Sequence, residues 1–132
     1  MSRYCLDTSA YSHLKRGHQG VLDVIDRAEW IGLPTITLGE LRTGFLMGGR
    51  RQANERELLD FLSHPVVEVV PVDAEVSHHF AEIVADLRRA GAPVPTNDVW
   101  IAASAARVGC LVLTFDRHFD AIARVGSVVL EA

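Results

Sequence analysis

Near its start the chain reads Arg3-Tyr4-Cys5-Leu6-Asp7-Thr8-Ser9, a short apolar run that gives way to one acid and two hydroxyl residues. Residues 3–6 predict a buried strand, and residues 8–16 predict a helix that ends at Gly17. The same order recurs at residues 110–123, where an apolar run again ends in an acid and a helix-like segment. Strands that alternate with helices predict an α/β domain with a mostly parallel sheet flanked by helices.

The rest of the chain continues this alternation, so that one domain is expected over residues 1–132. Further strands are expected at residues 31–36, 66–70, 110–113 and 128–130, and further helices at residues 21–28, 37–47, 51–63, 74–90, 98–108 and 117–123. Pro34 is a point at which the first of these strands could break. The two helices within residues 37–63 predict a hairpin that leans off the sheet, a natural place for a dimer or partner surface.

The composition indicates a folded domain, because nearly half of the 132 residues are apolar. No apolar run reaches the roughly 20 residues that span a bilayer. The first residues are strand-like and lack a charged-then-apolar leader, so we expect a cytoplasmic protein. Cys5 and Cys110 lie in apolar runs without nearby cysteine or histidine partners, so we expect buried free thiols and no zinc site.

Four acids stand at the points where predicted strands give way to helices: Asp7, Glu40, Asp98 and Asp116. In a parallel sheet the carboxyl ends of the strands share one edge, where ligands bind. Acids scattered along the sequence can therefore converge on one site. Converged carboxylates repel one another unless a hard cation joins them, and Mg²⁺ and Mn²⁺ favour such oxygen ligands.

The net charge of −4 does not by itself favour a nucleic-acid partner, since phosphate neutralisation usually needs basic surface. The four acids account for the whole deficit, because without them 13 acidic residues face 13 basic ones. Arginines also gather within residues 42–56 and at residues 88–89. These arginines either hold an RNA backbone or form ordinary solvated helix faces.

Each acid also has a local structural interpretation. Asp7 could cap the helix that follows it, but Thr8 or Ser9 could serve as the cap instead, so that the acid is not needed there. Thr37 and Glu40 have the spacing of a capping box, in which the glutamate turns back to the helix start. The local pattern alone leaves the role of Glu40 open.

The two later acids have similar alternatives. Asp98 follows Asn97, a good helix cap, and an acid in the first turn is favoured by the helix dipole. Asp116 could cap the short helix expected at residues 117–123, and Asp120 is a possible substitute or additional ligand. The six histidines show no zinc-like spacing, and His118 is a candidate for substrate contact because it is close to Asp116.

Taken in order, four segments resemble the PIN-domain ribonucleases, and most closely the VapC-type toxins of bacterial toxin–antitoxin pairs. They are Leu6-Asp7-Thr8-Ser9, Thr37-Leu38-Gly39-Glu40-Leu41, Asn97-Asp98-Val99-Trp100-Ile101-Ala102-Ala103 and Leu113-Thr114-Phe115-Asp116. Each segment is a weak pattern alone, but all four in this order form a specific one. The resemblance covers nearly the whole chain.

The resemblance implies a metal-dependent endoribonuclease that cleaves RNA with Mg²⁺ or Mn²⁺ and arrests growth. Asp7, Asp98 and Asp116 would be direct or water-bridged metal ligands, and Glu40 would be a further ligand or would orient the attacking water. Thr8, Asn97 and Thr114 would support these acids through hydrogen bonds. The resemblance also implies a VapB-type antitoxin as partner and a homodimer.

Two other classes remain to be weighed. Haloacid dehalogenase phosphatases need a second aspartate two positions after the first, where this chain has Ser9, and receiver domains need a late lysine, whereas Lys15 is the only lysine. Both are therefore disfavoured. The remaining alternative is a catalytically silent module of the same fold that binds RNA or a partner.

Overall fold

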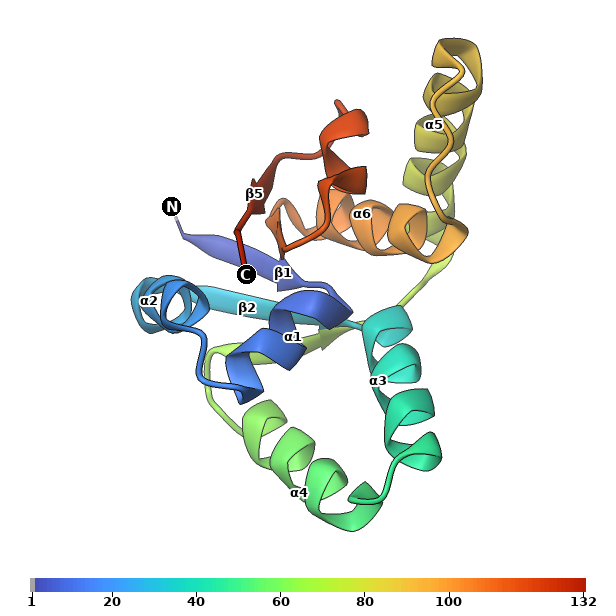
Figure 1. Ribbon diagram of the computed structural model, residues 1–132. Helices are drawn as coiled ribbons and strands as arrows, with labels where there is room; N and C mark the ends of the chain where they lie inside the picture. Colours follow the sequence, from blue (N-terminus) through green and yellow to red (C-terminus); the bar gives the residue numbers. More distant parts are fainter. Residues whose placement is uncertain (1) are drawn as a thin grey trace.

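The computed structural model describes residues 2–132 as strands alternating with helices (Figure 1). The strands are β1 Arg3–Leu6, β2 Trp30–Pro34, β3 Val67–Val70, β4 Leu111–Thr114 and β5 Ser127–Val129. The helices are α1 Thr8–Lys15, α2 Gln19–Arg27, α3 Thr35–Met47, α4 Arg51–Leu62, α5 Ala74–Ala90 and α6 Thr96–Val108, with a short 3₁₀ helix, η1 Arg117–Ala121. The predicted α/β alternation is confirmed.

The strands form one sheet in the order β3-β2-β1-β4-β5, and every neighbouring pair is parallel. The chain first builds outward from β1 through β2 to β3, and then returns to add β4 and β5 on the other side of β1. The strand order therefore reverses between β1 and β4. In open parallel sheets, ligands bind at the carboxyl ends of the strands beside such a reversal.

Helices cover both faces of the sheet, and each face has its own core (Figure 1). Because side chains alternate along a strand, Cys5 faces the core under α5 and α6, whereas Leu6 faces the core under α1 to α4. Burial of each large aliphatic side chain stabilises the fold by about 1.5–3 kcal/mol. Cys5 and Cys110 are buried free thiols, as expected.

Gly32 in β2 is closely surrounded by neighbouring side chains. A Cβ at this position would lie 2.8 Å from the Trp30 ring and 2.8 Å from the Val70 side chain. Real Cβ contacts are not this short, so the strand needs glycine here. Within residues 2–132, no helix has both the length and the apolar character needed to cross a membrane.

The starts of three helices differ from the sequence-based expectation. α2 begins at Gln19, α3 at Thr35 and α6 at Thr96, in each case two residues earlier than predicted. Pro34 is the N-cap of α3 and Pro95 is the N-cap of α6, where their fixed φ and missing N–H suit the first turn of a helix. The predicted helix at residues 117–123 is the shorter 3₁₀ helix η1.

Candidate functional site

The four acids lie on the elements that meet at the reversal point of the sheet. Asp7 directly follows β1, and Asp116 comes two residues after the end of β4. The two strands are neighbours, and the Asp7 N–H donates to the Leu113 carbonyl at 3.3 Å. Glu40 belongs to α3 and Asp98 to the first turn of α6.

Asp7 is the most enclosed of these acids, with 4 % of its surface exposed. Its Oδ1 accepts hydrogen bonds from the Ser9 hydroxyl at 2.8 Å and the Ala10 N–H at 2.9 Å, and its Oδ2 accepts from the Thr114 hydroxyl at 2.5 Å. Asp7, Ser9 and Thr114 are called the buried half of the site below. In this half both oxygens of the carboxylate are held in place.

These contacts decide which of the three candidate caps, Asp7, Thr8 or Ser9, begins α1. Asp7 itself is the N-cap, through its bond from Ala10. The Ser9 hydroxyl instead donates to Asp7 and accepts from the Phe115 N–H at 3.0 Å, so that it ties α1 to the segment after β4. Capping of α1 therefore does not exclude a further role for Asp7.

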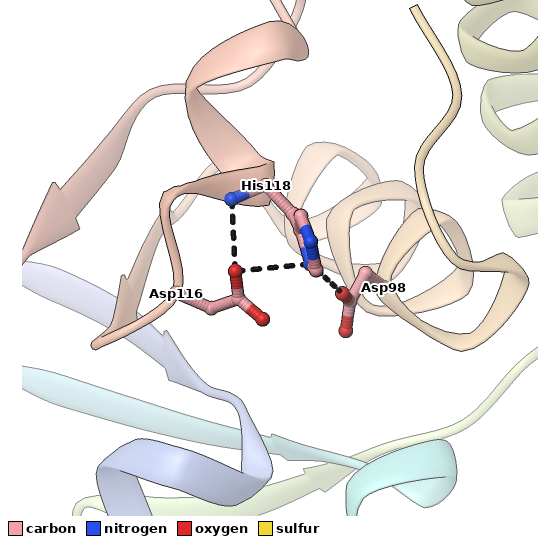
Figure 2. Close-up of side chains that lie close together, drawn as sticks. All are labelled: Asp98, Asp116 and His118. Carbon is pink, nitrogen blue, oxygen red and sulfur yellow. Dashed lines mark hydrogen bonds and ion pairs between the residues drawn. The ribbon is translucent and has the colours of Figure 1, made fainter.

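Asp98, Asp116 and His118 form a second group, called the open half below (Figure 2). His118 Nδ1 lies 2.9 Å from Asp116 Oδ1 and 3.3 Å from Asp98 Oδ2. One ligand atom from each residue lies within 4.8 Å of the other two. The exposed fractions of these side chains are 17 % for Asp98, 38 % for Asp116 and 50 % for His118, so solvent and ligands can reach the group.

Asp116 also caps η1, because its Oδ1 accepts from the His118 N–H at 2.9 Å. The Thr114 hydroxyl links the two halves: it donates to Asp7 and accepts from the Asp116 N–H at 2.9 Å. The role proposed for Thr114 as a support for the acids agrees with this geometry. Asp120, in contrast, faces Arg117 at 3.7 Å and lies outside the group.

Glu40 bridges the starts of α1 and α6. Its Oε1 accepts from the Thr8 hydroxyl at 2.6 Å, and its Oε2 accepts from the Asn97 side chain at 3.3 Å. The alternative of a capping box is excluded, because Thr37 is the third residue of α3 and its buried hydroxyl donates to the Leu6 carbonyl at 3.0 Å. The glutamate is thereby left to face the site edge.

The charge of Asp116 affects the protonation of both Asp7 and Asp98. Burial raises the pKa of Asp7, although hydrogen bonds from Thr114, Ala10 and Ser9 oppose the shift, and the charge of Asp116 adds to it. Burial also raises the pKa of Asp98, with the charges of Asp116 and Asp7 acting in the same direction and His118 opposing them. Mutual repulsion of this kind favours a bound cation.

The donor chemistry of the open half suits a divalent metal ion. Two carboxylates offer the hard oxygen ligands that Mg²⁺ and Mn²⁺ prefer, and one imidazole adds a nitrogen. His118 was predicted only as a substrate contact. The signal that identifies it is its position two residues after Asp116, at the start of a short helix that follows a strand end.

Two of the arginines within residues 42–56 form ion pairs on the α3–α4 hairpin, which supports their interpretation as part of a solvated helix face. Arg42 makes a two-pronged ion pair with Glu55, at 3.0 and 2.9 Å, and Arg50 lies 3.9 Å from Glu57. The first pair joins α3 to α4, and the second joins the N-cap of α4 to the same helix. We therefore place no RNA contact on these two arginines.

Comparisons with known proteins agree with the fold and show the family. Residues 4–125 match the PIN domain. The chain is 39 % identical to Ribonuclease VapC4 of Mycobacterium tuberculosis over 94 residues, covering 71 % of this chain and 72 % of that relative. It is 32 % identical to Ribonuclease VapC5 of the same organism over 123 residues, covering 93 % and 90 %.

A solved structure described as DNA-bound VapBC from Salmonella typhimurium superposes on the chain with a TM-score of 0.84 and 27 % identity. The alignment covers 97 % of this chain and 98 % of the other. Sequence and structure therefore agree over nearly the whole length. The chain belongs to the PIN-domain family and, within it, to the VapC ribonucleases.

Proposed function

We propose that the protein is a metal-dependent endoribonuclease, the toxin of a type II toxin–antitoxin pair, with its nuclease domain over residues 1–132. The observation that carries the proposal is the convergence of Asp7, Asp98 and Asp116 around the reversal point of the sheet. The relatives named as VapC ribonucleases support the reaction class. The proposed place of action is the cytoplasm, where bacterial RNA is found.

Asp98 and Asp116 would hold Mg²⁺ or Mn²⁺, with Asp7 as a direct or water-bridged third acid. When bound, the ion supplies Lewis-acid chemistry: it lowers the pKa of water and offsets negative charge on the phosphate. The buried half would keep Asp7 in one orientation, because hydrogen bonds fix both of its oxygens. Preorganised ligands of this kind avoid reorganisation during the reaction.

Glu40 would orient the attacking water or complete the ligand set. Thr8 and Asn97 hold its two oxygens from the starts of α1 and α6, so its carboxylate can move little. A carboxylate in this position can accept a hydrogen bond from the water that attacks phosphorus. Movement of either helix start would remove one of these two contacts.

The proposed protein partners are a VapB-type antitoxin and a second copy of this chain. The Salmonella structure is a VapBC complex by its description, which supports the antitoxin. The α3–α4 hairpin exposes large apolar side chains: Leu46 and Met47 near its tip, with exposed fractions of 60 % and 85 %, and Leu59 in the last turn of α4, with 54 %. Exposed apolar groups gathered in this way are typical of interaction surfaces.

The test is cleavage of RNA by purified protein freed of antitoxin. We expect cleavage with Mg²⁺ or Mn²⁺, none in EDTA, and recovery when metal is restored. The matched pair of variants is Asp98→Asn, which should be inactive, and Asp120→Asn, which changes a nearby acid outside the open half. Full activity in EDTA would contradict the metal mechanism. If the wild type binds RNA but cleaves it neither with Mg²⁺ nor with Mn²⁺, the result would favour a catalytically silent module.

A further inference from the structure

We infer that His118 is itself a ligand of the metal ion, through Nδ1, and that this nitrogen makes the site prefer Mn²⁺ to Mg²⁺. The inference rests on the proposed function, because it concerns the ion that Asp98 and Asp116 would hold. It adds a residue that lies outside the set of four acids and a metal preference that those acids alone do not imply.

The first support is geometric. Mg²⁺ takes octahedral geometry with bonds of about 2.0–2.1 Å, so neighbouring ligand atoms lie about 3 Å apart. His118 Nδ1 lies 2.9 Å from Asp116 Oδ1 and 3.3 Å from Asp98 Oδ2. Nδ1 therefore has the spacing of a neighbouring ligand to both carboxylates. An ion placed between the three atoms needs only small adjustments of the side chains.

The second support is the way in which the fold holds the ring. The Asp116 carboxylate accepts a hydrogen bond from the His118 backbone N–H, and this bond fixes the first turn of η1. The next residue, Phe119, is 1 % exposed and anchors η1 in the core beside α6. Figure 2 shows the imidazole pointing from η1 toward Asp98 on α6. The ring is thus positioned by the backbone and by a core anchor.

The chemistry then separates the two metals. Mg²⁺ is a hard ion that dehydrates reluctantly and favours oxygen, whereas imidazole suits the transition metals. A site of carboxylates alone accepts Mg²⁺ and Mn²⁺ alike. Replacement of one oxygen by the His118 nitrogen should strengthen Mn²⁺ binding more than Mg²⁺ binding.

The experiment measures metal binding without RNA. Calorimetric titrations with Mn²⁺ and Mg²⁺ compare the wild type with His118→Ala and with His78→Ala, an exposed histidine on α5 that serves as control. We expect His118→Ala to weaken Mn²⁺ binding by about tenfold or more, and Mg²⁺ binding by less than about threefold. His78→Ala should bind both ions as the wild type does.

Electron spin-echo spectroscopy of Mn²⁺ gives a second readout, and its result on the wild type does not depend on the folding of any variant. Coupling to a directly bound imidazole nitrogen is expected, and its loss in His118→Ala would assign the nitrogen. Bound Mn²⁺ without this coupling would overturn the inference and leave the proposed function standing. Tighter Mn²⁺ binding by His118→Ala would also overturn it, because His118 would then compete with the ion. Failure of the wild type to bind either ion would overturn both.

Discussion

The two halves of the site use the same residue type in opposite ways. Asp7 and Asp116 both follow strands of the central sheet, and both cap the helix that comes next. Asp7 is buried, with both oxygens engaged by hydrogen bonds, whereas Asp116 is 38 % exposed and faces His118 across a short gap. Hydrogen bonds thus hold the Asp7 carboxylate in one orientation, whereas solvent can reach the Asp116 carboxylate.

The largest effect should come from the open half. We expect Asp98→Asn to lower the rate of RNA cleavage by at least about 100-fold. Mutation of residues that only support metal ligands through hydrogen bonds already lowers metal affinity or activity by about 10–100-fold. Induced expression of the wild type should arrest growth, and the variant at equal protein level should not. Asp120→Asn should remain toxic. A toxic Asp98→Asn variant would separate growth arrest from this site.

Glu40, which joins neither half, should show the next largest effect. Glu40→Gln keeps the size of the side chain but weakens the acceptor that Thr8 and Asn97 hold. We expect a loss of about 10–100-fold in cleavage rate, as for supporting residues of metal sites, with a change of less than about 0.5 kcal/mol in unfolding free energy. Near-normal cleavage would return Glu40 to a purely structural role.

Stability should distinguish the two capping aspartates. Asp7→Ala removes the buried carboxylate to which Ser9, Ala10 and Thr114 donate hydrogen bonds. The substitution should lower the unfolding free energy by about 1–3 kcal/mol. Asp116→Ala removes the cap of a five-residue 3₁₀ helix and should cost less than about 1 kcal/mol. Urea denaturation measures both values. Equal losses of unfolding free energy in the two variants would mean that Asp7 is held no more firmly by its surroundings than Asp116.

The pH dependence should be the smallest effect. The folded pKa values of Asp7 and Asp98 are raised by burial, so the unfolded state binds fewer protons than the folded state between the unfolded and folded pKa values. These groups therefore cost no stability at pH values below the unfolded pKa, and their cost grows as pH rises through the folded pKa. In EDTA, the stability difference between the wild type and Asp98→Asn should be present at neutral pH and should close on acidification. A stability difference between the two proteins that does not change with pH would contradict an origin in the raised pKa values.

The sequence predicted the alternation of strands and helices because apolar periodicity and glycine and proline positions are local signals. It also placed the acids at one edge, since parallel strands share the direction of their carboxyl ends. It left open whether Asp7, Thr8 or Ser9 caps α1, because all three are local candidates. It could not give the partner of the Thr37 hydroxyl or of the second Asp7 oxygen, because these partners are distant. Thr114 lies 107 positions from Asp7, and the carbonyl of Leu6 lies 31 positions from Thr37.

His118 was undervalued for the same reason. Its pairing with Asp98 spans 20 positions and depends on how η1 is set against α6. Near Asp116 the sequence showed only a short polar segment with one histidine. The packing of Phe119 beneath η1, which orients that histidine, is a tertiary contact that local patterns do not report.

The most direct test of the clustered carboxylates is a thermal melt of the wild type and Asp98→Asn, each in EDTA and in millimolar Mg²⁺. Like charges forced together cost stability, so we predict that Asp98→Asn is more stable than the wild type in EDTA by about 0.5–2 kcal/mol. Mg²⁺ should stabilise the wild type by mass action and the variant much less. If Asp98 only favours the start of α6, the variant will be less stable in EDTA and both proteins will respond equally to Mg²⁺, which would contradict a metal site here.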